Sequence, residues 1–143
     1  GHIAKEDLIL KVLEWMPTKS QMAARLRAAH NLAPRGRRVN KADNDRSFVE
    51  TLVDLGTGAH VVQTVPAAFC AFMGSESFQD AVEVAIRAGG DTDTTGAIVG
   101  ALAGTYYGIE QVARYADKVE EGGALRGLEV RLIASSKAVT GAR

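Results

Sequence analysis

Glycine recurs at every fourth position of an otherwise apolar stretch that begins after residue 95. The glycines of this row are Gly96, Gly100, Gly104 and Gly108. Residues four apart share one face of a helix, and each glycine inside a helix costs about 1 kcal/mol relative to alanine. Close packing of another backbone against the glycine face has to offset this cost. The row therefore predicts a central helix.

The stretch at the start of this helix, residues 89–96 (GGDTDTTG), combines a pair of adjacent glycines, two carboxylates and three hydroxyls, and ends at Gly96. The glycines permit a sharp turn, and an Asp or Thr can then cap the helix. Capping accounts for one carboxylate but not for two. Asp91, Asp93 and Thr94 can instead converge on one point, and oxygen donors select magnesium, manganese or calcium. Spacing alone leaves capping and metal binding open.

Two other aspartate motifs overlap these residues. An EF-hand loop needs a bidentate Glu at its twelfth position, where this chain has Leu102. The pattern Asp-x-Asp-x-Thr resembles the nucleophile motif of haloacid-dehalogenase-type phosphatases, in which the aspartates follow a buried strand. Residues 85–90 continue a helical pattern instead. Both alternatives are therefore disfavoured.

Apolar residues at helical spacing recur along the whole chain, and no segment alternates as a strand does. The fold class predicted is all-α. Helices are expected near residues 6–16, 21–30, 46–55, 64–73, 78–88, 94–107, 110–119 and 124–139. Ser20 and Ser77 are the expected N-caps of two of them. Gly56 is expected to stop the third, and Asp43–Asp45 to cap its start.

Composition describes one globular domain. The chain has 143 residues, 46% of them apolar, with 17 basic and 17 acidic residues. Balanced charge predicts neither a nucleic-acid nor a membrane partner, and residues 94–107 are too few to span a bilayer. The single cysteine, Cys70, lies in an apolar helical run and is expected to be a buried, reduced thiol of a cytoplasmic protein.

Other polar segments have both a structural and a functional interpretation. Arg35, Arg37 and Arg38 in the loop before residue 44 could bind a pyrophosphate, although a solvated connection is favoured. The turn Gly56-Thr57-Gly58 could bring backbone amides close to a phosphate or ribose, but helix stops often look the same. His30 and His60 are expected to be structural.

The run Gly89–Gly108, GGDTDTTGAIVGALAGTYYG, resembles the C-terminal signature of the ADP-ribosylglycohydrolase family. The turn Gly56–Gly58 and the segment Thr64–Ala68 (TVPAA) also resemble segments of that family. This resemblance implies an orthogonal multi-helix fold around a binuclear Mg²⁺ or Mn²⁺ site. It implies that Asp91, Asp93 and Thr94 are metal ligands and that Gly56, Thr57 and Gly58 border the ADP-ribose pocket.

The family's Thr-Asp-Asp motif, expected from an N-terminal half, is absent from this sequence. Residues 1–2 are interpreted as a tag remnant and residues 3–143 as the C-terminal portion of the domain. Two carboxylates and one hydroxyl cannot fill two octahedral cations without many waters. An exposed glycine-rich helix then predicts self-association or association with the missing half.

The resemblance implies a metal-dependent hydrolase that cleaves the glycosidic bond of ADP-ribosylated proteins or small molecules. One alternative is an inactive structural or ADP-ribose-binding relative that has lost half of the site. Another is a magnesium phosphatase, whose activity would be measured as phosphate release from an aryl phosphate.

Overall fold

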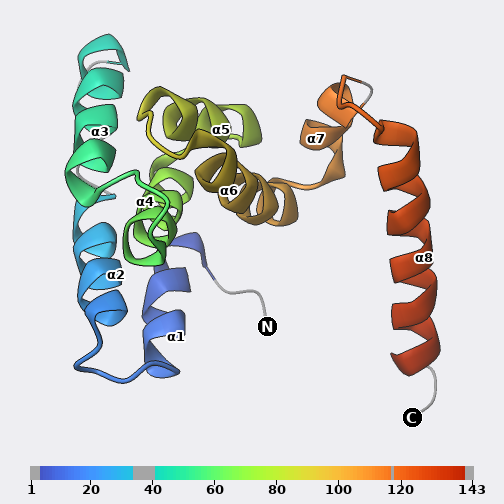
Figure 1. The fold of residues 1–143 in the computed structure, drawn as a ribbon, viewed down its shortest axis with the longest axis horizontal. Helices are drawn as coiled ribbons and strands as arrows, with labels where there is room; N and C mark the ends of the chain where they lie inside the picture. Colours follow the sequence, from blue (N-terminus) through green and yellow to red (C-terminus); the bar gives the residue numbers. More distant parts are fainter. Residues whose placement is uncertain (1–3, 34–40, 117, 141–143) are drawn as a thin grey trace. The chain divides into compact units, whose positions relative to one another are not determined.

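The computed structural model describes residues 4–33, 41–116 and 118–140, and all regular structure within them is helical (Figure 1). The elements are η1 (Lys5–Asp7), α1 (Leu8–Glu14), α2 (Gln21–Leu32), α3 (Lys41–Leu55), α4 (Val61–Gly74), α5 (Phe78–Arg87), α6 (Thr92–Tyr107), α7 (Ile109–Ala116) and α8 (Gly122–Thr140). The predicted all-α class is confirmed. The chain divides into two units, residues 1–111 and 112–143.

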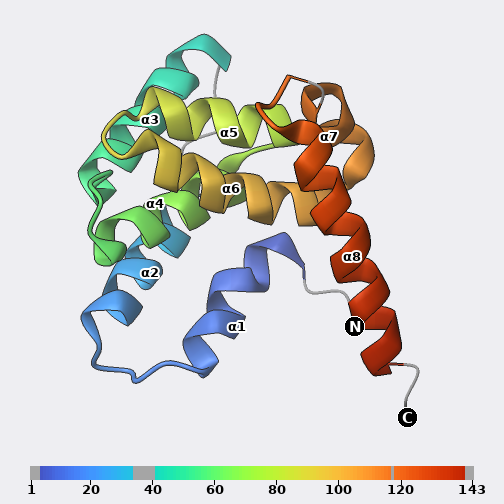
Figure 2. The same cartoon turned by 45° about the vertical axis from the view of Figure 1, so that its right-hand side comes forward.

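Helix α4 is the centre of the first unit. It packs against α2, α3, α5 and α6, and it carries no charged residue between Val61 and Gly74. Its buried side chains are mostly small, among them Ala67, Ala68 and Ala71, so neighbouring helices can approach it from several sides. The helix predicted to be central, α6, packs mainly against α4 and α5 within the described residues (Figure 2).

The glycine row of α6 does not pack as the sequence predicted. The buried residues of this helix are Thr95, Val99 and Ala103, one position before each glycine. A Cβ built on Gly96, Gly100 or Gly108 meets no atom within 4 Å among the described residues. The prediction of a backbone packed on the glycine face is therefore wrong for the part of the chain that the structure describes.

Caps fix several helix ends as predicted. Ser20 Oγ accepts a hydrogen bond from the Ala23 backbone N–H at 3.1 Å, and Ser77 Oγ accepts one from Asp80 N–H at 3.1 Å. The Asp80 carboxylate reaches back to Glu76 N–H at 2.8 Å. Gly56, with φ of +87°, ends α3.

Two helices begin earlier than the sequence predicted. Helix α3 begins at Lys41, so Asp43–Asp45 lie inside it rather than at its N-cap. Helix α4 begins at Val61 because His60 caps it, with Nδ1 accepting from Val62 N–H at 3.4 Å. Pro66 consequently lies inside α4 rather than in its first turn.

Helical spacing in the sequence predicts a buried stripe of Phe48, Leu52 and Leu55 in α3, and the structure confirms it. The same spacing predicts that Val82, Ala85 and Ile86 of α5 face inward, which is partly wrong, since Ile86 is 51% exposed. Helix α5 instead buries Ala81, Val84 and Ala85, a set at i, i+3 and i+4. Figures 1 and 2 both show α5 alongside α6.

Lys5 of η1 connects the C-terminal ends of α4 and α6. Its ammonium group donates to Ser75 O at 2.5 Å and to Tyr107 Oη at 2.6 Å. It also lies 4.8 Å from the ring centroid of Phe72 and 5.1 Å from that of Tyr107. A cation at the carbonyl ends of two helices interacts favourably with both dipoles.

The second unit consists of the end of α7 and of α8. The adjacent glycines Gly122 and Gly123 predict a turn from the sequence, but helix α8 begins at Gly122 and includes both. Helical spacing in the sequence predicts four inward-facing apolar residues in this helix, and all four are about half exposed or more: Leu125, Leu128, Leu132 and Ile133. Among the described helices, none is both long and apolar enough to cross a membrane.

Candidate functional site

Helix α5 leads into α6 through two glycines with left-handed backbone angles. Gly89 has φ of +71° and Gly90 has φ of +73°, a region that disfavours other residues. Asp91 follows at the N-cap position of α6, yet its side chain makes no capping hydrogen bond within the described chain. The capping interpretation therefore fails for Asp91 among the described residues.

The carboxyl groups of Asp91 and Asp93 interact with each other. A side-chain hydrogen bond with Asp91 lowers the pKa of Asp93, and the backbone N–H of Thr94 lowers it further. That N–H donates to Asp93 Oδ1 at 2.8 Å. Both interactions favour the ionised form of Asp93.

The donor set suits a hard cation in its chemistry. Asp91, Asp93 and Thr94 all offer oxygen, and none of the three is buried. Among the described residues, no group of three or more His, Cys, Asp and Glu side chains could hold a metal ion. These residues thus fit one cation that keeps several waters, and they do not complete a binuclear centre.

Thr95, the next residue along α6, differs from its neighbour. It is 2% exposed, and its Oγ1 has no hydrogen-bond partner in the described part of the chain. The sequence analysis did not single it out. Its helical spacing with Val99 and Ala103 is the signal that would have indicated burial.

The structure brings the Gly56–Gly58 turn directly against the start of α6. The Asp91 backbone N–H donates to Thr57 O at 2.7 Å. A Cβ on Gly90 would lie 2.2 Å from Thr57 O and 2.5 Å from Thr57 Oγ1. Only glycine at position 90 permits this approach, so the two predicted site segments form one surface.

Side chains from α2 and α4 hold this turn. Thr64 Oγ1 donates to Gly58 O at 2.7 Å. Arg25 Nη2 donates to Leu55 O, and Arg25 Nε donates to Val62 O at 3.3 Å. No local pattern in the sequence indicates the role of Arg25, because its partners lie 30 and 37 positions away. Thr64 belongs to the segment Thr64–Ala68 that resembles the family, although that pattern does not indicate its bond to Gly58 O.

Three further predictions fall elsewhere. Cys70 is fully buried, and burial raises the pKa of its thiol to about 12, so the inert interpretation is supported. The segment before Gly89 is helix α5, which contradicts the strand that a phosphatase motif requires. The basic cluster of Arg35, Arg37 and Arg38 lies outside the described residues.

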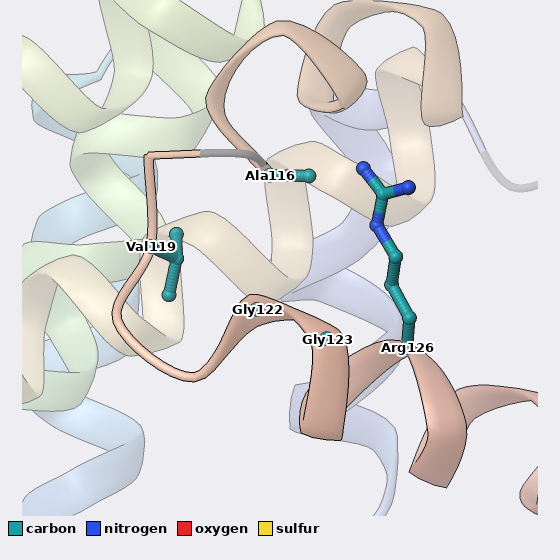
Figure 3. A pocket seen from close by; sticks show the side chains of 5 residues that line it. All are labelled: Ala116, Val119, Gly122, Gly123 and Arg126. Carbon is teal, nitrogen blue, oxygen red and sulfur yellow. The ribbon is translucent and has the colours of Figure 1, made fainter.

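The second unit has an open pocket with a volume of about 250 Å³ (Figure 3). Its lining comprises Ala116, Val119, Gly122, Gly123 and Arg126. In Figure 3 the Arg126 side chain extends from α8 past Gly123. None of the described residues lining this pocket belongs to the predicted site.

The sequence model of the ADP-ribosylglycohydrolase family matches residues 1–141. The chain belongs to this family. The resemblance inferred from residues 56–58, 64–68 and 89–108 is therefore confirmed.

Several curated relatives are similar to parts of the chain. ADP-ribosylhydrolase ARH3 of Bos taurus is 36% identical over 74 residues, which is 44% of this chain and 20% of that protein. ARH3 of Gallus gallus is 29% identical over 136 residues, 78% of this chain and 36% of that protein. The chain thus spans between 20% and 36% of these relatives.

A bacterial relative is similar as well. The ADP-ribosyl-[dinitrogen reductase] glycohydrolase of Rhodospirillum rubrum is 32% identical over 56 residues, 39% of this chain and 19% of that protein. No solved structure matches the chain. In this member of the ADP-ribosylglycohydrolase family, the turn before α4 and the start of α6 are joined by the hydrogen bond from Asp91 N–H to Thr57 O.

Proposed function

We propose that the whole protein hydrolyses the glycosidic bond of ADP-ribosylated substrates with a divalent cation held partly by this chain. The single observation that carries the proposal is the Asp91–Asp93 carboxyl pair at the start of α6. Its first member has no capping role within the described residues. The names of the relatives, which include ADP-ribosylhydrolases and a glycohydrolase, agree with this activity.

The residues that would hold the cation are Asp91, Asp93 and Thr94. Carboxylate and hydroxyl oxygens suit Mg²⁺ or Mn²⁺. A bound cation would supply Lewis-acid chemistry and lower the pKa of a coordinated water. The ionised state of Asp93, favoured by its hydrogen bonds, is the state that binds metal.

The Gly56–Gly58 turn would contact the substrate. It lies against the carboxyl pair through the bond from Asp91 N–H to Thr57 O. Its two glycines leave the backbone open to close approach by a phosphate or ribose. We expect specificity for an N-linked or an O-linked ADP-ribosyl group to depend on the residues that contact the leaving group.

The test is substitution of Asp93 in the whole protein, with release of ADP-ribose from arginine-linked and serine-linked substrates as the readout. Asp93→Ala is expected to abolish metal-dependent release on whichever linkage the protein cleaves. Asp54→Ala, at an exposed carboxylate of α3, is the matched control and should leave turnover unchanged. Unchanged turnover in Asp93→Ala would overturn the proposal.

One observation favours a second candidate, a protein that binds ADP-ribose without cleaving it. The described residues supply two adjoining carboxylates but no group of three metal-binding side chains. Calorimetric titration with ADP-ribose distinguishes the candidates, because the second predicts binding to the whole protein with no product. Phosphate release from an aryl phosphate separates a phosphatase from both.

A further inference from the structure

Arg25 connects both ends of the loop that contains the Gly56–Gly58 turn. Its Nη2 donates to Leu55 O, the last carbonyl before Gly56, and its Nε donates to Val62 O in the first turn of α4 at 3.3 Å. A Cβ on Gly56 would lie 3.3 Å from Arg25 Nη2. One guanidinium on α2 therefore joins the end of α3 to the start of α4.

The carbonyl of Val62 needs the Arg25 donor because residue 66 is a proline. In an α-helix the carbonyl of residue 62 accepts from the N–H of residue 66. Residue 66 is Pro, inside α4, and it has no N–H. The Arg25 bond to Val62 O replaces the missing helical bond. A charge-assisted hydrogen bond of this kind is worth more than a neutral one.

The loop held by Arg25 in turn holds the carboxyl pair. Thr57 lies two residues after Leu55, and its carbonyl accepts from Asp91 N–H at 2.7 Å. Thr64 Oγ1 fixes the other side of the turn through Gly58 O at 2.7 Å. Displacing Leu55 O from its partner would displace Thr57 O, and with it the backbone of Asp91.

We propose that Arg25 is a positioning residue for the Asp91–Asp93 carboxyl pair and acts through the Gly56–Gly58 turn. This role rests on the proposed function, in which the two carboxylates bind a metal ion and have to be held in place. Arg25 touches neither carboxylate. Its effect on metal binding passes through two hydrogen bonds that the turn connects: Arg25 to Leu55 O, and Asp91 N–H to Thr57 O.

The first test measures amide hydrogen exchange at Asp91 by NMR in the metal-free chain. Arg25→Met is expected to accelerate this exchange about tenfold or more, the equivalent of losing one charge-assisted hydrogen bond. Arg27→Met is the matched control, since Arg27 is on the same helix, is exposed, and donates only to Thr18 O among the described residues. It should change the Asp91 exchange rate less than about twofold.

A second substitution separates positioning from general stability. Pro66→Ala restores an N–H for Val62 O, so the double variant Arg25→Met/Pro66→Ala should regain part of the lost thermal stability. Leu55 O still lacks its donor there, and Asp91 exchange should remain fast. Recovery of Asp91 protection in step with stability would overturn the proposal. If Arg25→Met does not fold, Arg25→Lys serves, because one ammonium cannot reach both carbonyls.

Manganese titration followed by EPR links the same variants to the proposed function. Arg25→Met should weaken Mn²⁺ binding about tenfold relative to wild type and Arg27→Met. Unchanged Asp91 exchange in Arg25→Met would overturn the positioning role, whatever the metal does. Fast Asp91 exchange in Arg25→Met, with no Mn²⁺ binding to the whole wild-type protein, would support the positioning role and overturn the proposed function.

Discussion

Gly90 allows the Gly56–Gly58 turn and the start of α6, which are distant in sequence, to approach each other closely. Its φ is +73°, and a Cβ there would lie 2.2 Å from Thr57 O. Gly89 has nearly the same φ, +71°, but a Cβ there meets nothing within 4 Å among the described residues. Substituting each of these two glycines in turn therefore distinguishes the cost of backbone strain from the cost of a steric clash.

We expect Gly89→Ala to lower the free energy of unfolding by about 1–2 kcal/mol, the cost of a left-handed non-glycine residue. Gly90→Ala should lose about 1–3 kcal/mol more, since it also pushes Thr57 away. Urea unfolding of both variants measures the difference. Equal losses would show that Thr57 O does not hold its observed position against Gly90.

Cys70 is a second residue whose surroundings decide its chemistry. It is fully buried, and its pKa is raised to about 12 by burial. At pH 8 about one thiol in ten thousand is then ionised, and the thiolate is the reactive form. An aromatic disulfide reagent should leave the native chain unlabelled over minutes and label one thiol in guanidinium. Rapid stoichiometric labelling of the native chain would contradict this.

At the scale of the helix, Lys5 joins η1 to the ends of α4 and α6. Lys5→Met removes its bonds to Ser75 O and Tyr107 Oη and its contact with the Phe72 ring. We expect the free energy of unfolding to fall by about 1–3 kcal/mol. Thermal unfolding followed by circular dichroism measures it.

The matched control is Lys11→Met on α1. Lys11 pairs with Glu14 at 2.9 Å, and the two side chains are 52% and 59% exposed. An exposed pair of this kind contributes less than about 1 kcal/mol. If both variants lose the same stability, the aromatic and carbonyl contacts of Lys5 add nothing beyond an exposed ion pair.

The sequence predicts a helix end correctly where the interaction that fixes this end is local. Ser20 and Ser77 were identified as caps because each acts on a residue three positions later. The start of α4 was placed at Thr64 rather than Val61, because His60 is an unusual cap. With a helix start at Thr64, Pro66 is expected in the first turn of α4. Arg25 supplies the donor that Pro66 lacks, but it lies 37 positions from Val62, so no local pattern in the sequence indicates it.

The candidate site was predicted in its parts but not in its assembly. The spacing of Asp91, Asp93 and Thr94 indicated a shared role, and the structure places the two carboxyls together. The contact of Thr57 with Gly90 and Asp91 joins residues more than thirty positions apart. Periodicity within one helix carries no information on such a contact, and only the family resemblance associated the two segments.

At the scale of the whole molecule, the two units differ in how they bury apolar side chains. The core consists of residues from Ile9 to Ala103. In the second unit, no side chain from residue 112 onward is buried among the described residues. Its apolar side chains include Leu132, which is 70% exposed. The first unit should therefore supply nearly all of the stability.

A matched pair of substitutions in the full chain tests this division. Leu52→Ala removes a side chain that is 1% exposed, and we expect a loss of about 2–5 kcal/mol. Leu132→Ala changes an equal volume at an exposed position and should cost less than about 0.5 kcal/mol. Urea unfolding measures both. A loss above about 2 kcal/mol for Leu132→Ala would show that α8 packs against a partner in solution.

Deletion of residues 118–143 extends the test from one side chain to the unit. The shortened chain keeps α7 and the bond from Phe78 N–H to Gln111 Oε1, 2.8 Å. Because it keeps the whole core, its unfolding should stay cooperative, with a stability change below about 1 kcal/mol and a midpoint shift below about 8 °C. A chain that loses cooperative unfolding would mean that α8 stabilises the first unit. Agreement between this deletion and Leu132→Ala would assign the stability of the molecule to η1 through α7.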